Sequence, residues 1–184
     1  MKRFYLLIAF IAITLCSYAQ FVLTPSAGLM TEDGPYIINR SGSEIENYNA
    51  AKKVIARVIP NAEMGDVEYE KSFNVTSEFK DKGRLPGAMV KTDWIIKYTL
   101  LVTCEDGKIS ISFKDLGEME VYRKGERVMN IYPTTGSNSM LGQAAGIQHI
   151  FNSKGVVASG CKKLKLMFET KANDLVKEIE NNLK

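Results

Sequence analysis

Basic side chains gather in one glycine- and proline-containing stretch, residues 79–94, which reads FKDKGRLPGAMVKTDW. Lys82, Arg84 and Lys91 stand there against only two acidic residues, so an anion-binding loop is one interpretation. A phosphate loop, however, needs backbone N–H groups at a helix start and a Gly-Lys-Ser/Thr ending. This stretch lacks that ending and leads into a strand. We therefore interpret it as a connector between strands that offers a contact surface for a ligand.

Two other groups of residues have the chemistry for catalysis. Glu118 and Glu120 lie two apart on a predicted strand, as do Glu68 and Glu70, so each pair shares a face. A glycosidase needs two carboxylates across a cleft, whereas neighbours on the wet side of a strand usually serve solvation. A hydrolase with an unfamiliar active site near His149 and Cys161 is the alternative function that this chemistry leaves open.

Cys104 and Cys161 are the two cysteines that follow residue 19, and their thiols could form a disulfide or remain free. A disulfide between them is allowed in an oxidising compartment, and two small buried apolar residues are the other interpretation. We predict no metal site, because His149 is the only histidine and no Cys-x-x-Cys pair exists. No cofactor is predicted either.

The first 19 residues have the parts of a secretory signal peptide: a basic start, an apolar run and a small-x-small ending. The run is shorter than the roughly 20 residues that span a bilayer, which disfavours an uncleaved anchor. Lipid modification of Cys16 is disfavoured because Leu15 before it is not small. We predict cleavage after Ala19, export to the periplasm or medium, and no transmembrane span in the mature chain.

Cleavage also removes two basic residues, so the 24 Lys and Arg fall to 22 against 21 Asp and Glu. A chain this close to neutral gives no electrostatic reason to bind nucleic acid, which we exclude as a partner. Residues 20–184 are enough for a single α+β domain with a substantial core.

The elements that would position these residues begin with an amphipathic helix over residues 43–58. Its apolar face is expected to carry Ile45, Tyr48, Ala51, Ile55 and Val58. Ser43 and Glu46 have the spacing of a capping box, and Pro60 stops the helix. Alternation over residues 66–79 predicts a strand with one dry face, and Val67 and Tyr69 are expected on it.

Asp106-Gly107 predicts a two-residue hairpin turn that pairs Cys104 with Ile109 and Val102 with Ile111. That register places the apolar residues on one face. The opposite, polar face is expected to be free for a partner.

Two further strands are predicted at residues 118–124 and 127–132. The pattern then weakens, although Met140, Ala144, Ile147 and Phe151 keep the spacing of a short helix. A long amphipathic helix over 164–183 closes the chain. A sheet with one apolar face and two main amphipathic helices predicts a two-layer α+β fold with both helices on that face.

This layout resembles the secreted bacterial domain of unknown function with a TATA-binding-protein-like fold. The resemblance covers a core of about residues 34–123 and rests on Tyr48, on Lys82-Gly83, and on a Tyr-x-Leu strand that meets Asp-Gly-Lys at 98–108. It implies a curved antiparallel sheet backed by helices and implies no DNA binding. The helical extension that we predict over 137–184 lies outside it, and it supplies no catalytic residues.

Together these observations predict an exported, non-catalytic binding or interaction module of the bacterial cell envelope. Its partner would be a protein, peptide or glycan of the envelope that the sequence does not identify. The candidate ligand-binding residues are Lys82, Arg84, Lys91, Lys97 and Lys108.

Overall fold

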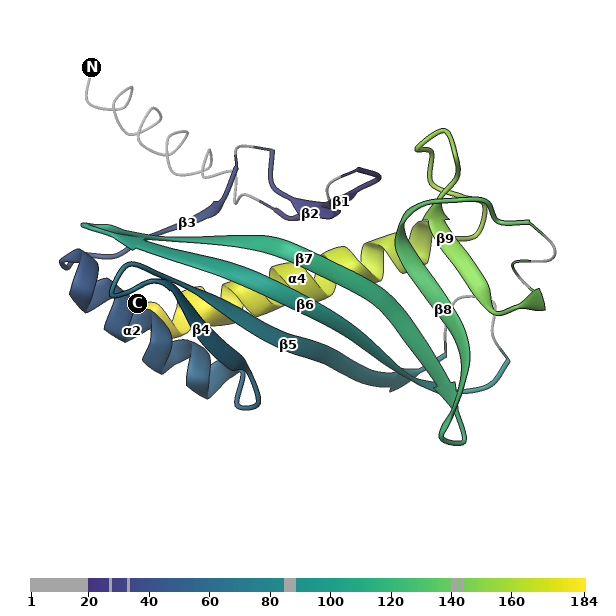
Figure 1. Ribbon diagram of the computed structural model, residues 1–184, viewed down its shortest axis with the longest axis horizontal. Helices are drawn as coiled ribbons and strands as arrows, with labels where there is room; N and C mark the ends of the chain where they lie inside the picture. The colour runs from purple at the N-terminus through teal and green to yellow at the C-terminus, as the bar shows by residue number, and fades with distance from the viewer. Residues whose placement is uncertain (1–19, 27, 33, 85–88, 140–141, 143) are drawn as a thin grey trace, which may run out of the picture.

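The computed structural model describes residues 20–184 except 27, 33, 85–88, 140, 141 and 143. The predicted signal peptide lies outside the described residues. A mixed, mostly antiparallel sheet has the strand order β4-β5-β6-β7-β8-β9, with β3 paired to β7, and β1 and β2 form a small separate sheet (Figure 1). The elements are β1 (Val22–Thr24), β2 (Gly28–Met30), β3 (Tyr36–Asn39), α2 (Glu44–Val58), β4 (Glu63–Glu68), β5 (Ser72–Gly83), β6 (Thr92–Glu105), β7 (Lys108–Arg123), β8 (Glu126–Thr135), β9 (Ile147–Phe151) and α4 (Lys162–Leu183).

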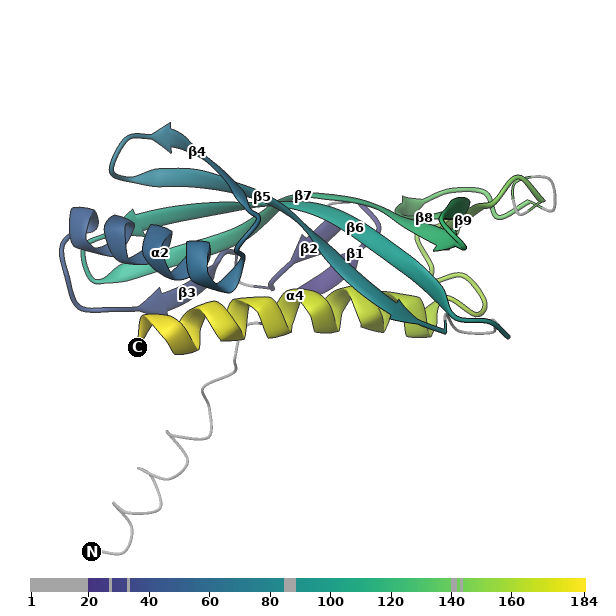
Figure 2. The same cartoon turned by 90° about the horizontal axis from the view of Figure 1, so that it is seen from below.

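The sheet has its two helices on the same side. Figure 2 shows α2 beneath one end of the sheet, whereas α4 runs beneath much of its length. The buried face of α4 consists of Leu164, Phe168, Ala172, Val176, Ile179 and Leu183. These side chains join the inward-facing residues of β5, β6 and β7 in one hydrophobic core. The predicted two-layer α+β fold is therefore confirmed.

The start of α2 is fixed by its sequence. The Ser43 hydroxyl accepts from the Glu46 N–H, and the Glu46 carboxylate accepts from the Ser43 N–H at 2.8 Å, which completes the predicted capping box. The helix buries Tyr48, Ala51 and Ile55 as expected. Ile45, which we expected on the same face, is instead 49% exposed.

The long hairpin of β6 and β7 has the predicted turn and register. Gly107 has φ +78°, a conformation that glycine adopts without steric cost. Cys104 pairs with Ile109, Val102 with Ile111 and Leu100 with Phe113. Because opposed residues share a face, this register buries all six on the helix side.

One predicted strand is in fact a hairpin. The chain reverses at Tyr69 and Glu70, and β4 and β5 pair with each other on either side. Glu70 has φ +59° in this turn. Val67 and Tyr69 are therefore exposed rather than buried. The alternation of residue types continues through the turn, so the sequence pattern gave no sign that the chain reverses there.

The predicted helical extension is corrected as well. Ile147–Phe151, assigned to a short helix, forms strand β9, which pairs in parallel with β8. Met140, the first residue of that predicted helix, lies outside the described residues. The long C-terminal helix is confirmed as α4. None of the helices in the described part of the chain has the length and hydrophobicity to cross a membrane.

Candidate functional site

A pocket of about 470 Å³ opens where the end of α2, the middle of α4 and one edge of β5 meet. We call it the edge pocket. The edge pocket exists because β4 is shorter than β5 and pairs with it only as far as Thr76. Before Glu63 the chain comes from α2 through Pro60, so no strand of the described residues pairs with the outer edge of β5 alongside Ser77–Gly83. The lining residues are Val58, Ile59, Pro60, Asn61, Glu63, Thr76, Ser77, Glu78, Phe79, Lys80, Lys97, Tyr98, Lys171 and Leu175.

Aromatic rings contribute to the inner wall of the edge pocket. Phe79 and Tyr98 stack with their ring centroids 4.3 Å apart, and the half-buried Leu175 of α4 also lines this wall. Burial raises the pKa of Tyr98 to about 12, although a hydrogen bond with Ser77 opposes the shift. The phenol therefore stays protonated at neutral pH. It can form hydrogen bonds but is poorly suited to act as a base.

Charged side chains lie near the mouth of the edge pocket, and most of them are paired. Lys171 donates to Asp81 at 2.7 Å and lies over the Trp94 ring. This hydrogen bond, together with one from the Lys82 N–H, lowers the pKa of Asp81. Lys80 pairs with Glu78. Lys97 is exposed and forms no ion pair with any described residue, so it is the cation available to an anionic group.

The five candidate ligand-binding residues do not form one site. Lys97 lines the edge pocket, whereas Lys82 lies at the end of β5 and pairs with Asp93 at 3.2 Å. Arg84 and Lys91 are exposed on either side of the undescribed residues 85–88.

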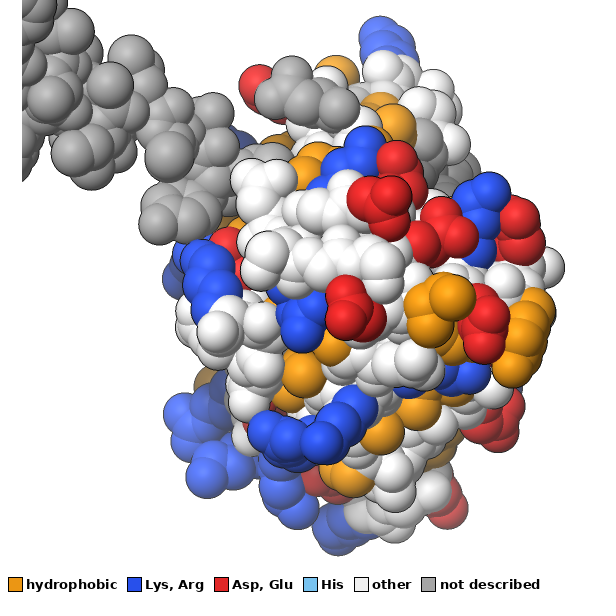
Figure 3. Space-filling view, turned by 90° about the vertical axis from the view of Figure 1, so that its left-hand side faces the viewer, with side chains coloured by type: hydrophobic (Ala, Val, Ile, Leu, Met, Phe, Trp, Pro, Cys, Tyr) orange, Lys and Arg blue, Asp and Glu red, His pale blue; other side chains and the backbone are white. Residues whose placement is uncertain are grey.

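Lys108 lies elsewhere, at the turn of the β6–β7 hairpin, where it pairs with Glu105 at 3.1 Å. Figure 3 looks at that end of the molecule and shows acidic and basic side chains intermixed. Lys108 therefore does not belong to a basic surface. Ile59, Lys171 and Leu175 of the edge pocket were not predicted as site residues, because only the docking of the helices brings them to β5.

His149 and Cys161 do not form a catalytic pair. In β9, Gln148 lies opposite the buried Ile131, while His149 lies opposite Tyr132, and the two rings stack at 5.1 Å. Neighbouring residues of a strand point to opposite faces. The Cys161 thiol lies on the Gln148 side of the strand, where it accepts a hydrogen bond from the Gln148 side chain at 3.1 Å. Its contact with His149 is with the backbone carbonyl and not with the imidazole ring. Burial raises the pKa of Cys161, which keeps the thiol protonated.

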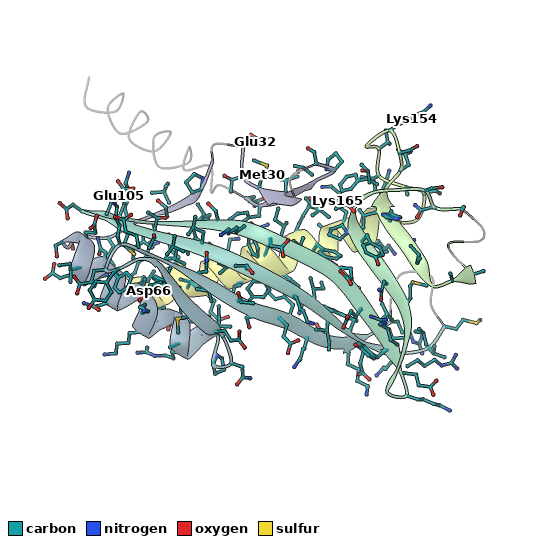
Figure 4. The ribbon with its side chains drawn as sticks, viewed as in Figure 1. Met30, Glu32, Asp66, Glu105, Lys154 and Lys165 are labelled. Carbon is teal, nitrogen blue, oxygen red and sulfur yellow. The ribbon has the colours of Figure 1, made fainter. Side chains whose placement is uncertain are left out.

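The Cys104–Cys161 disulfide does not form in the structure. Both cysteines are buried and free. In Figure 4 Glu105, the neighbour of Cys104, is labelled at the left-hand end of the molecule, and Lys165, one turn after Cys161, is labelled to the right of its middle. Helix α4 begins at the β9 end, and its length separates the two thiols. Burial raises the pKa of Cys104 to about 11, so it fits the other interpretation, a small apolar core residue.

The carboxylate pairs have no catalytic arrangement. Glu70 lies in the turn after β4, so it does not share a strand with Glu68. Glu120 accepts from the Tyr122 hydroxyl at 2.7 Å and from Arg127. Within the described ranges, no three His, Cys, Asp or Glu side chains gather closely enough to hold a metal ion.

Comparison with known proteins identifies the fold. No family model matches the chain, and none of the curated proteins searched matches it. A DUF4468 family protein from Bacteroides ovatus is similar in structure, with a TM-score of 0.53, 14% identity, and coverage of 88% of this chain and 92% of that one. A TBP-like protein from Parabacteroides distasonis has a TM-score of 0.50 and 14% identity over 80% of this chain and 88% of its own. The chain therefore has a TATA-binding-protein-like α+β fold, as the resemblance in its sequence predicted.

Proposed function

We propose that this protein is an exported, non-catalytic binding module of the bacterial cell envelope and that the edge pocket is its ligand site. The observation that carries this proposal is the pocket itself. Its volume lies within the range of ligand sites, and its lining combines an apolar and aromatic group of side chains with a larger number of polar and charged ones. The bacterial assignment is supported by the sources of the two similar structures.

Binding fits the lining chemistry better than catalysis does. The two carboxylates of the edge pocket are Glu63 and Glu78, and Glu78 is engaged by Lys80. None of the lining residues is a histidine or a cysteine. The Tyr98 phenol stays protonated. A nucleophile activated by a neighbouring base, which covalent catalysis requires, is therefore not assembled there.

The proposal is tested by filling the edge pocket with a larger side chain. Leu175→Trp places an indole in the pocket, whereas Leu166→Trp adds the same group to α4 at a position that is 61% exposed. Thermal unfolding would be followed with three probes: soluble peptidoglycan fragments, envelope glycans, and a peptide digest of envelope proteins. A probe at one hundred times its Kd stabilises the native state by about 2.7 kcal/mol.

We expect at least one probe to raise the Tm of the wild type and of Leu166→Trp but not of Leu175→Trp. Circular dichroism would establish that both variants fold. The proposal is wrong if no probe shifts the Tm of the wild type, or if Leu175→Trp responds as the wild type does.

A further inference from the structure

The direction of the main-chain groups of β5 follows from its register. The Cys104 N–H donates to the Lys71 carbonyl at 2.8 Å, just before Ser72 pairs with Thr103. From there β5 pairs with β6 without any register shift. In an antiparallel ladder, hydrogen-bonded pairs alternate along the strand. Odd-numbered residues of β5 therefore direct their N–H and C=O groups to β6, and even-numbered residues direct theirs away from it.

The outward groups have partners only along part of β5. Asn74 and Thr76 lie opposite Gly65 and Glu63 of β4. Beyond them, the outward N–H of Lys82 is occupied, because it donates to the Asp81 carboxylate at 2.7 Å. The N–H and C=O groups of Glu78 and Lys80 have no hydrogen-bond partner among the described residues. This short segment is an open strand edge.

We propose that an extended peptide segment of a partner protein pairs with this edge as an added strand, with its main chain bonded to Glu78 and Lys80. The proposal rests on the proposed function and names the ligand class of the edge pocket. Donors and acceptors alternate along the edge, about 7 Å apart every second residue, which is the spacing that another strand presents. Strand addition of this kind gives affinity through the main chain and specificity through pockets for alternate side chains.

The walls of the edge pocket define which side chains the peptide carries. An added strand would lie beside β5 in line with β4, so its successive side chains would point alternately to the two faces of the sheet. On the helix side they meet Ile59, Phe79 and Leu175, which favour an apolar residue. On the other side they lie beside Glu78 and Lys80, which pair with each other, and Lys97 lies on the same face one strand further in. Lys97 is unpaired among the described residues, so this face favours an acidic side chain. The structure thus favours a partner segment with alternating apolar and acidic residues.

A second copy of this chain is the other occupant to consider for the edge. Self-pairing about Lys80 would place two lysines directly opposite each other, which is destabilising, whereas self-pairing about Phe79 would place Glu78 opposite Lys80 of the copy. Charged residues on an edge strand commonly prevent self-association. The oligomeric state is therefore one of the outcomes of the test.

The test separates main-chain pairing from side-chain charge at one position. Lys80→Pro removes the outward N–H and leaves the ladder to β6 without loss of a donor. Lys80→Ala removes the charge and retains the N–H, so it is the matched control. The probe is a phage-displayed library of random decapeptides, from which the best binders are synthesised and titrated against the folded protein. We expect Lys80→Pro to weaken binding by about tenfold or more and Lys80→Ala by only about threefold.

N-methylation of the peptide gives a second readout in which the protein is unchanged. A methyl group removes one donor at a time. Strand addition therefore predicts that affinity falls at every second residue of the bound segment and stays unchanged at the residues between. This period-two response does not depend on whether Lys80→Pro folds.

The outcomes separate the proposal of strand addition from the proposed function of the edge pocket. Peptides that bind without a period-two response, or equally to Lys80→Pro and Lys80→Ala, overturn strand addition. If no peptide is selected while a glycan binds and is lost in Leu175→Trp, the peptide class is overturned and the proposed function stands. A dimer that Lys80→Pro disrupts assigns the edge to a second copy and overturns the proposal. If nothing binds, both proposals fail.

Discussion

At the scale of single residues, three connected polar side chains lie away from the edge pocket. Tyr48 of α2 donates its hydroxyl to Asp66 of β4, and Lys52 donates to the same carboxylate oxygen at 2.8 Å. Lys52 also lies over the Tyr48 ring. These three side chains tie α2 to the first strand that follows it. The capping spacing at the start of α2 was readable from the sequence, but this triad was not, because its third member lies on another element.

The triad makes stability depend on pH. Hydrogen bonds from Lys52 and then from Tyr48 lower the pKa of Asp66 in the folded state. A carboxyl group with a lowered folded pKa adds stability above its unfolded pKa of about 3.9 and loses that contribution as the pH falls through the folded value. The gap in unfolding free energy between wild type and Asp66→Asn should therefore shrink from pH 7 to pH 3.

Urea unfolding at both pH values measures this gap. Asp174→Asn, which changes an exposed carboxylate of α4, is the control. A gap for Asp66→Asn that is the same at pH 7 and at pH 3 would contradict the assignment.

At the scale of elements, sequence-based prediction was accurate where the signal is local. The Asp106-Gly107 turn fixes the register of β6 and β7, because a slip of one residue would expose every apolar side chain of the hairpin. The turn at Glu70 and the parallel pairing of β9 were missed. The alternation of apolar and polar residues persists through the turn at Glu70. The parallel pairing of β9 depends on contacts with β8 that no local spacing encodes. The edge pocket was missed for the same reason, since Leu175 and Phe79 lie on different elements.

The hairpin register predicts unequal costs for two neighbouring substitutions. Val102 is fully buried, so Val102→Ala should lower the free energy of unfolding by about 1–3 kcal/mol through the space it opens. Thr103 lies half-buried on the opposite face, and Thr103→Ala should cost less than about 1 kcal/mol. Chemical denaturation of both variants measures the difference. Equal costs would contradict the prediction that the hairpin packs more tightly on its helix side than on its other face.

At the scale of the whole molecule, the first described residues are held by the C-terminal helix α4. Phe21 is buried, its N–H donates to the Asn173 side chain of α4 at 2.8 Å, and the Asn173 amide donates back to the Phe21 carbonyl at 3.0 Å. Gln20, immediately before it, is exposed. The core therefore begins one residue after the predicted cleavage site.

The proposed export predicts a defined mature terminus. When the full chain is expressed in a bacterial host, N-terminal sequencing of the exported protein should begin at Gln20, because Ser17 and Ala19 suit the signal peptidase. Since Gln20 is exposed, a terminus there is compatible with the seating of Phe21 against α4. A chain that still starts at Met1, or one that starts at a lipid-modified Cys16, would show that the predicted processing is wrong.

The bond between Phe21 and Asn173 joins residues that are 152 positions apart in the sequence. During synthesis the first strand emerges long before the helix that holds it, so the core cannot close until the last segment of the chain is available. Contacts of such high sequence separation slow folding, because the entropy of a long loop must be lost before they form. The N-terminal segment therefore cannot take its place in the core before α4 has been synthesised. Such a delay suits the export that we propose, because a secretion channel threads a polypeptide before it folds.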